Sequence, residues 1–295
     1  VSQYPNLGSA SQLAFDADTG KINWQYQYTP HDAWDFDGIN EGVLTDLTIG
    51  GSKIPALLHA DRNGFFYVLN RDTGKVVAAD PFVTVNWATH VDLVTGRPVE
   101  APNNEKRPQL GKWARNVCPN LIGGKNWSPM SYSMQTGLVY LPAFNMCMDI
   151  ANREEEYTPG KFYLASEFNL GMPGATGDNL AEFIAWDPVA KKKVWSIPEA
   201  NMWASGAMTT AGGLVFYGNI DGMLKALDAK TGKVLWQFRV GTGITQSAVT
   251  YAIDGKQYLA IVAGRVKGPP SFFGKLGQKM MEASPEGGIL MVFAL

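Results

Sequence analysis

A short phrase recurs four times along the sequence, and this repeat limits the possible folds more than any other feature. Each copy has an apolar run, an Asp or Asn, a turn that closes on Thr-Gly or its substitute, and a second run. The copies are "LAFDADTGKINWQYQ" (13–27), "FYVLNRDTGKVVAADPF" (66–82), "FIAWDPVAKKKVWSI" (183–197) and "LKALDAKTGKVLWQFRV" (224–240). Gly20, Gly74 and Gly232 supply the positive φ that such a turn requires. The sequence therefore predicts a repeated β-hairpin.

The spacing of the copies favours an all-β fold with blades arranged around an axis. Further short apolar runs lie between the copies, and the repeat returns at intervals of roughly 40 to 60 residues, which is typical of four-stranded propeller blades. Three copies end on Trp24, Trp195 and Trp236, which we expect to pack on neighbouring blades. The 32 Gly, 17 Pro and 9 Trp suit many short strands and tight turns. A β-sandwich with repeated hairpins is the alternative.

Two segments do not follow the repeat. Residues 271–285 read as a short helix or a loop, and residues 83–115 read as a long excursion with little periodicity. Such an excursion would lie on one face of the propeller and shape its site.

Charge and hydropathy exclude two classes of partner. The formal net charge is only −2, which argues against a nucleic-acid partner. No apolar run of about 18 residues or more is present, so no membrane span is expected. Cys118 and Cys147 form either a disulfide or two unrelated buried thiols, and no C-x-x-C-H motif for covalent haem attachment occurs.

The segment "TPHDAWDFDG" (29–38) crowds three carboxylates and a histidine together. In an extended segment Asp35 and Asp37 would face the same side, and two carboxylates so placed form a natural site for a hard cation. Asp32 could instead cap the loop. His31 is expected to be a structural hydrogen-bonding residue, because hard cations prefer oxygen ligands. Taken alone, an Asp in a loop is more often a turn or cap residue.

Taken together, several motifs resemble those of one enzyme family. The repeats, with "TPHDAWDFDG", "HADRNGFFYVLNR", "GGKNWSPMSYS" and "GGLVFYGNIDG", resemble the quinoprotein alcohol dehydrogenases, which use pyrroloquinoline quinone (PQQ). The resemblance implies an eight-bladed β-propeller, of which residues 1–295 would supply the C-terminal part, roughly four to five blades. A second chain or a missing N-terminal half would complete the ring.

The resemblance also implies a metal site. Asp35 matches the family's catalytic aspartate, which accepts the hydroxyl proton of the alcohol and binds the metal. An Asp at the position of Asp37 marks the lanthanide-dependent members, whereas Ca²⁺-dependent members usually carry a small uncharged residue there. We therefore expect a lanthanide(III) ion bound by Asp35 and Asp37, with Ca²⁺ as the alternative, because Coulomb attraction grows with the charge product.

Four further residues match cofactor contacts of the family. Arg62 matches the arginine that hydrogen-bonds the quinone oxygens, and Asn126 matches the asparagine at the quinone edge. Trp127 is expected to line the pocket, and Trp203 matches the tryptophan that lies against the flat cofactor. In addition, Cys118 and Cys147 match a family disulfide, which implies a periplasmic location.

The resemblance finally implies a reaction. The protein would oxidise primary alcohols to aldehydes by hydride transfer to PQQ, with the metal as Lewis acid and Asp35 as base. A soluble cytochrome c would be the electron acceptor. The alternatives are a propeller scaffold without catalysis and an inactive fragment.

Overall fold

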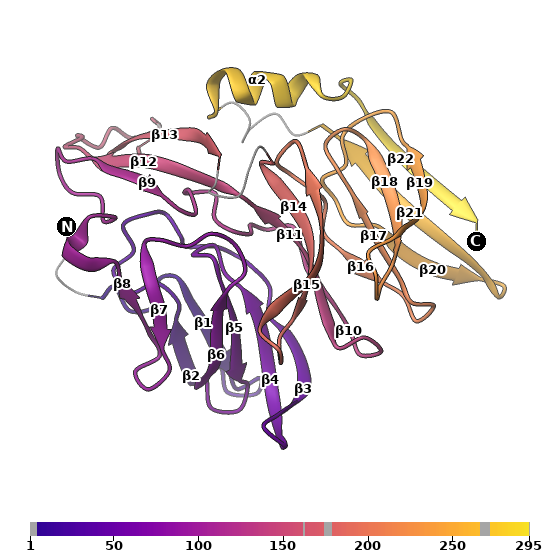
Figure 1. Cartoon of the computed structure of the whole chain (residues 1–295), viewed down its shortest axis with the longest axis horizontal. Helices are drawn as coiled ribbons and strands as arrows, with labels where there is room; N and C mark the ends of the chain where they lie inside the picture. The colour runs from indigo at the N-terminus through magenta and orange to yellow at the C-terminus, as the bar shows by residue number, and fades with distance from the viewer. Residues whose placement is uncertain (1–4, 162, 174–178, 266–271, 295) are drawn as a thin grey trace.

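The fold, taken from a computed structural model, is an arc of antiparallel β-sheets (Figure 1). The structure describes residues 5–161, 163–173, 179–265 and 272–294. The expected helix or loop at 271–285 is the helix α2 (Gly274–Glu282), although residue 271 itself lies outside the described residues. In the described part of the chain, no helix is long and apolar enough to cross a membrane.

Five sheets follow one another along the arc, and their radial order confirms the propeller prediction. Three have four strands, the first has two and the last has three. In chain order the strands are β1 (Ser11–Phe15) and β2 (Ile22–Gln27); β3 (Val43–Ile49), β4 (Ser52–Ala60), β5 (Phe65–Asn70) and β6 (Val76–Pro81); β10 (Ser131–Ser133), β11 (Leu138–Phe144), β14 (Ala181–Asp187) and β15 (Lys192–Glu199); β16 (Met208–Thr209), β17 (Leu214–Gly218), β18 (Met223–Asp228) and β19 (Val234–Arg239); and β20 (Val249–Ile253), β21 (Lys256–Gly264) and β22 (Gly288–Ala294).

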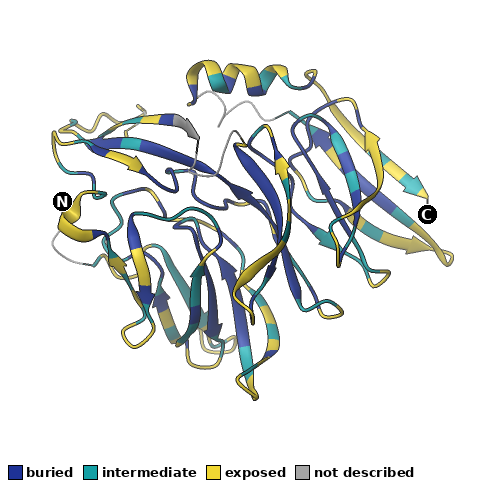
Figure 2. Cartoon of the chain, viewed as in Figure 1, coloured by how far each residue is buried: buried dark blue, intermediate teal, exposed yellow. Residues whose placement is uncertain are grey.

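The core lies between neighbouring sheets rather than inside one closed layer. Separate apolar clusters fill the spaces between successive blades, and Figure 2 shows the buried residues along the inner strands. Tyr140 and Phe183 of one blade, for example, share a cluster with Tyr217 of the next. The rings of Phe183 and Tyr217 stack with centroids 4.0 Å apart. Each blade is therefore stabilised mainly by its neighbours.

The repeated tryptophans join one blade to the glycine turn of the next. The indole of Trp24 donates to the carbonyl of Arg71 at 2.8 Å, and a Cβ on Gly74 would lie 2.6 Å from the Trp24 ring. In the same way, a Cβ on Gly232 would lie 2.7 Å from the ring of Trp195. The expected docking is therefore present for these two rings. Trp236 also packs on the next blade, because its ring contacts Phe293 of β22 as well as Phe238 of its own strand, and it is 39% exposed.

The one repeat copy without Trp precedes the one turn without Gly. Ala78 takes the place of the Trp in β6, opposite Val68. In the next blade Lys191 takes the place of the turn glycine, with φ of 57°. Lys191 also lies beside β6, since its Nζ is 3.8 Å from the Asp80 carboxylate. Both members of the Trp–Gly contact are thus replaced together.

Replacing Gly74 by Ala is expected to destabilise the protein more than replacing Gly137 by Ala. Both glycines have φ of 70°, so both substitutions carry the same backbone strain. A Cβ at position 74 also collides with the Trp24 ring, whereas nothing lies within 4 Å at position 137. Overpacking of this kind typically costs about 1–3 kcal/mol. Denaturant unfolding of the two variants measures the difference, and equal losses would contradict the docking role of Trp24.

The excursion at 83–115 is more regular than the sequence analysis predicts. It contains the hairpin of β7 (Ala88–Asp92) and β8 (Arg97–Glu100), the 3₁₀ turn η1 (Pro102–Asn104) and the strand β9 (Ala114–Val117). The β7–β8 turn repeats the blade chemistry: the Asp92 carboxylate accepts from the amides of Val94 and Thr95, and Gly96 has φ of 70°. The turn pattern "DLVTG" (92–96) is therefore present in the sequence, but no Trp follows it as in three of the four repeat copies.

A separate three-stranded sheet lies on the same side of the arc as α2 (Figure 1). Its strands are β9, β12 (Met146–Asn152) and β13 (Ser166–Pro173). Cys118, directly after β9, forms a disulfide with Cys147 in β12, which confirms the bridge that the family resemblance implies. The bridge therefore links two neighbouring strands of this sheet.

Candidate active site

The acidic loop after β2 is organised by the carboxylate of Asp32. One oxygen of this group accepts from the amide of Trp34 at 2.9 Å. The other accepts from the amides of Phe36 at 2.7 Å and Asp37 at 3.0 Å. Local carboxylate-to-amide bonds of this kind compete well with regular secondary structure. The prediction that Asp32 caps the loop is confirmed, and its pKa is raised to about 6, chiefly by burial.

Alternation along the loop separates its aromatic and acidic side chains. Trp34 and Phe36 are fully buried and pack against Trp87, with Trp34 and Trp87 centroids 4.7 Å apart. Asp35 and Asp37 both line a cavity on the other side. Asp35 has φ of 67°, a region that Asp tolerates better than most residues. The buried rings of Trp34 and Phe36 therefore fix the loop in place, and the carboxylates of Asp35 and Asp37 face the cavity.

Arg62 faces these carboxylates from the turn between β4 and β5. Its NH2 group lies 3.3 Å from the Asp35 carboxylate and also donates to the carbonyl of Leu121, while NH1 donates to the carbonyl of Asp37 at 2.5 Å. Its aliphatic part runs between Gly38 and Gly123, where an added Cβ would lie 2.6 Å and 2.7 Å from Arg62 atoms. The guanidinium is therefore held in one position, and its buried Nε has no hydrogen-bond partner in the described part of the chain.

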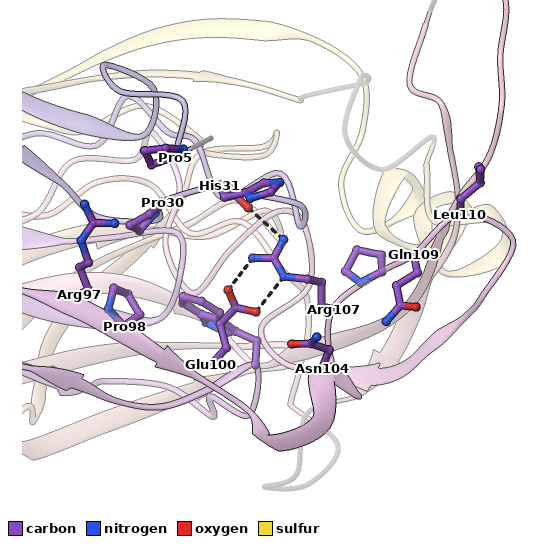
Figure 3. Close-up of a pocket in the computed structure, with 12 residues that line it drawn as sticks. Pro5, Pro30, His31, Arg97, Pro98, Glu100, Asn104, Arg107, Gln109 and Leu110 are labelled. Atoms are coloured by element: carbon purple, nitrogen blue, oxygen red, sulfur yellow. Dashed lines mark hydrogen bonds and ion pairs between the residues drawn. The ribbon is translucent and has the colours of Figure 1, made fainter. Parts of the chain in front are cut away.

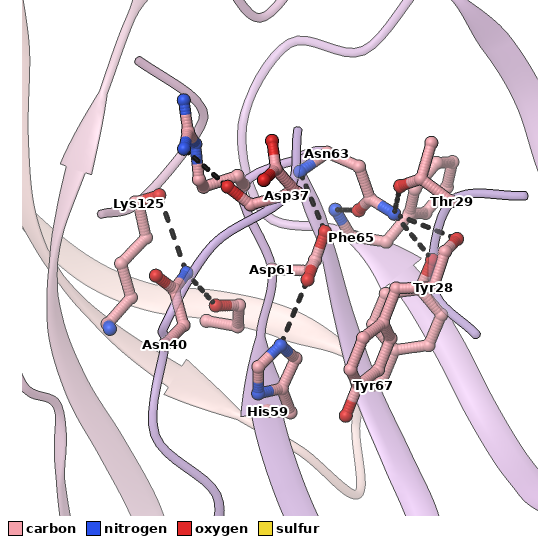
Figure 4. A network of polar contacts seen from close by, with 12 residues as sticks. Tyr28, Thr29, Asp37, Asn40, His59, Asp61, Asn63, Phe65, Tyr67 and Lys125 are labelled. Atoms are coloured by element: carbon pink, nitrogen blue, oxygen red, sulfur yellow. Dashed lines mark hydrogen bonds and ion pairs between the residues drawn. The ribbon is translucent and has the colours of Figure 1, made fainter. Parts of the chain in front are cut away.

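A buried polar network supports the turn that carries Arg62 (Figure 4). His59 Nε2 lies 3.0 Å from the carboxylate of Asp61, and the other oxygen of that carboxylate accepts from the amide of Asn63 at 2.9 Å. The side chain of Asn63 donates to the hydroxyl of Tyr67 at 2.9 Å and accepts from the amide of Phe65 at 3.1 Å. Fully connected buried networks of this kind rigidify their surroundings.

Asn126 lies at the cavity wall and is fixed from behind by an ion pair. Its side chain donates to the carbonyl of Ile122 at 2.7 Å. The neighbouring Lys125 is completely buried, and its Nζ lies 2.9 Å from the carboxylate of Glu41 and 3.0 Å from the carbonyl of Asn126. Losing one member of such a pair would leave an uncompensated buried charge. The Glu41–Lys125 pair therefore joins the loop of Asp35 to the segment of Asn126.

The two tryptophans of the predicted site take different places. Trp127 lines the cavity and is 41% exposed. Trp203 lies behind it, almost fully buried, with the two rings stacked at 4.8 Å and Phe144 packed edge-on against Trp203. Trp203 also has φ of 70°, which is unusual for a bulky residue, and its indole N–H has no partner in the described residues. The direct contact predicted for Trp203 with a flat cofactor stays a prediction.

The cavity has a volume of about 400 Å³ and is lined by both polar and apolar residues. Asp35, Asp37, Arg62 and Asn126 supply its polar groups. The apolar residues are Ile39, Leu121, Ile122, Trp127, Leu164, Phe168 and Phe272. Motif reasoning missed Leu164, Phe168 and Phe272, because they come from β13, its preceding loop and the start of the α2 region, far from any recognised motif.

The electrostatics of the cavity favour a cation. The pKa of Asp35 is raised to about 7; burial is the largest cause, the Arg62 guanidinium lowers it, and the Asp37 carboxylate raises it. Two carboxylates are chemically suited to a hard cation, which takes roughly six to eight oxygen ligands when it is Ca²⁺. Within the described residues, no group of three or more His, Cys, Asp or Glu side chains could hold a metal. Asp35 and Asp37 are thus chemically suited to such an ion, but they would supply only part of its coordination shell.

These features agree with comparisons to known protein families. A family profile described as the PQQ glucose/ethanol/alcohol dehydrogenase β-propeller domain matches residues 2–81 and 181–259, more than half of the chain. The chain belongs to this family of quinoprotein dehydrogenase β-propeller domains.

Proteins similar in sequence or structure to this chain are named as methanol or ethanol dehydrogenases. The chain is 47% identical over 88% of its length to a lanthanide-dependent methanol dehydrogenase of Methylacidiphilum fumariolicum, covering 42% of that protein. It is 43% identical over 99% of its length to a quinoprotein ethanol dehydrogenase of Pseudomonas aeruginosa, covering 47% of it. A solved europium-containing methanol dehydrogenase is 42% identical, with a TM-score of 0.91, over 98% of this chain and 53% of that one. The chain thus spans about half the length of these relatives.

Proposed function

We propose that residues 1–295 form the C-terminal part of a periplasmic PQQ-dependent dehydrogenase that oxidises primary alcohols to aldehydes. The observation that carries the proposal is the convergence of Asp35, Asp37, Arg62 and Asn126 on one cavity. Relatives named as methanol and ethanol dehydrogenases support the substrate class. The disulfide of Cys118 and Cys147 supports an oxidising compartment.

The polar groups of the cavity fit a quinone and a cation. Arg62 lines the cavity, and its buried Nε is a donor without a protein partner in the described residues, for which a quinone oxygen is a suitable acceptor. Asp35 and Asp37 would hold a lanthanide(III) ion, or alternatively Ca²⁺, with further oxygen ligands from outside these two side chains. Relatives named as lanthanide-dependent support the first ion. When bound, PQQ supplies the acceptor for the hydride.

The chain's own residues would carry the remaining tasks. Asp35 would accept the hydroxyl proton of the alcohol at its carboxylate, as a general base. Arg62, fixed between Gly38 and Gly123, would present positive charge at a constant position, which avoids reorganisation during the reaction. The apolar wall with Phe168 and Phe272 would bind the hydrocarbon part of the alcohol and exclude water.

Two partners belong to the proposal. A second chain or an N-terminal half would complete the propeller, and a soluble cytochrome c would accept the electrons. Both follow from the family resemblance.

A reconstitution experiment tests the proposed activity. The protein, together with any chain that copurifies with it, is incubated with PQQ and either La³⁺ or Ca²⁺, and an artificial dye reports electron transfer from ethanol. We expect ethanol-dependent dye reduction that requires both PQQ and the metal. Binding of PQQ and metal without any alcohol-dependent reduction would favour the inactive alternatives.

A further inference from the structure

We propose that Arg107 is a positioning residue for the acidic loop, residues 31–37, and holds its first residue, whereas Arg62 holds its last. The consequence for catalysis rests on the proposed function, whereas the structural role can be tested without it. Arg107 follows η1 in the excursion at 83–115, outside every motif of the repeat.

Arg107 contacts both the backbone and an anchoring ring of the loop. Its NH1 group donates to the carbonyl of His31 at 3.1 Å. The centre of its guanidinium lies 4.5 Å from the ring centroid of Trp34, within the range of a cation–π interaction. The preceding residue adds a third contact, because the Trp34 indole donates to the carbonyl of Lys106 at 2.6 Å. The loop is thus attached to residues 106–107 at two separate points.

A bidentate ion pair with Glu100 fixes the side chain of Arg107 (Figure 3). Its Nε and NH2 groups donate to the two carboxylate oxygens of Glu100, at 2.8 Å and 2.5 Å. Bidentate pairs of this kind are strong and directional. The arginine side chain is 16% exposed and the glutamate side chain 33%, so the pair is partly shielded from water. Glu100 ends β8, and the β7–β8 hairpin therefore supplies the fixed support.

The acidic loop is consequently held at both ends by arginines. Arg62 donates to the carbonyl of Asp37 at one end, and Arg107 donates to that of His31 at the other. Between them, the Asp32 carboxylate binds three loop amides. Arg62 lines the candidate active site, whereas Arg107 lines a different cavity of about 770 Å³. Arg107 therefore acts through the loop and not on a bound substrate.

The test compares Arg107→Lys with Arg115→Lys in the isolated holoprotein. Arg115 is a matched control, because its guanidinium lies 4.6 Å from the Trp113 ring and 2.7 Å from the Asp149 carboxylate, yet it is 63% exposed and makes no recorded contact with the loop. Lysine keeps the charge but cannot reproduce the planar fork. Hydrogen exchange of the loop amides reports the structural role, and titration with Eu³⁺ reports metal affinity.

We expect Arg107→Lys to speed exchange at the amides that bind Asp32 and to weaken Eu³⁺ binding roughly 10- to 100-fold, the usual effect of losing a support of a metal ligand. Arg115→Lys should change neither quantity. Equal loop exchange in the two variants would overturn the inference. Should the wild-type protein bind neither Eu³⁺ nor PQQ, the proposed function fails, and the exchange comparison still decides the role of Arg107.

Discussion

Replacing Asp37 by Asn is expected to weaken lanthanide binding far more than Ca²⁺ binding. Asn keeps the size of the side chain and one oxygen ligand but removes one negative charge. Removal of one negative charge costs a trivalent ion three unit-charge interactions and a divalent ion two. The difference is one such interaction, which is about 4 kcal/mol at 4 Å and an effective dielectric constant near 20. This difference corresponds to a shift of up to roughly a thousandfold in relative affinity. Competition between Eu³⁺ and Ca²⁺ measures the shift.

The control for Asp37→Asn is Glu154→Gln. Glu154 is an exposed acid that lines a second cavity, to which Asp37 also contributes, and its loss tests the effect of net charge alone. The loop geometry should persist in Asp37→Asn, because the contacts with Asp32 and Arg62 use the backbone of Asp37. Equal losses of affinity for both ions would show that Asp37 does not select the ion by charge.

Replacing Asp35 by Asn is expected to reduce turnover of a primary alcohol about 10²- to 10⁴-fold, the usual contribution of a general base. Asn is a suitable substitute because it tolerates the positive φ of position 35 about as well as Asp. Turnover is compared at saturating metal and PQQ, since Asp35 is also a proposed ligand. The measurement is the rate of ethanol-dependent dye reduction.

The content of bound metal and quinone must be known for the Asp35→Asn protein before its rate is interpreted. A variant that holds both yet turns over within tenfold of the wild-type rate would rule out Asp35 as the base. A slow variant that holds both would locate the loss in proton transfer rather than in assembly of the site.

The fold could be predicted largely because its signals are local. The Asp-x-x-Thr-Gly turns carry their own hydrogen bonds, as at Asp228 and Thr231, and each Gly takes the positive φ that the pattern predicts. The β7–β8 hairpin was missed because its second strand, Arg97–Glu100, lacks the apolar run of the repeat copies and also the Trp that three of the four carry. Pairing of β9 with β12 was missed because it joins distant segments of the chain.

The site was predictable to the extent that it follows motifs. Asp35, Asp37, Arg62, Asn126 and Trp127 line one cavity, while their roles in metal binding, cofactor binding and catalysis stay predictions. Trp203 also matches a family motif, although Ala204 and Ser205 after it depart from the family pattern, and the stacking of Trp127 on it depends on packing that no motif predicts.

The contacts that hold the site residues in place could not be predicted from any pattern in the sequence. The buried Lys125–Glu41 pair joins residues 84 positions apart, and the contact of Arg107 with His31 spans 76. Such contacts depend on how blades and excursions meet in space. In the sequence alone, Glu41, Lys125 and Arg107 cannot be distinguished from charged residues on the surface.

The most direct test of the central claim is the metal and quinone content of the isolated native protein, with any copurifying chain identified. Elemental analysis gives the ion, and absorbance gives the quinone. The account predicts about one lanthanide ion and one PQQ for each cavity of Asp35, Asp37 and Arg62. Bound PQQ with Ca²⁺ would keep the dehydrogenase but contradict the role of Asp37, and a protein with neither ion nor quinone would contradict the proposed function.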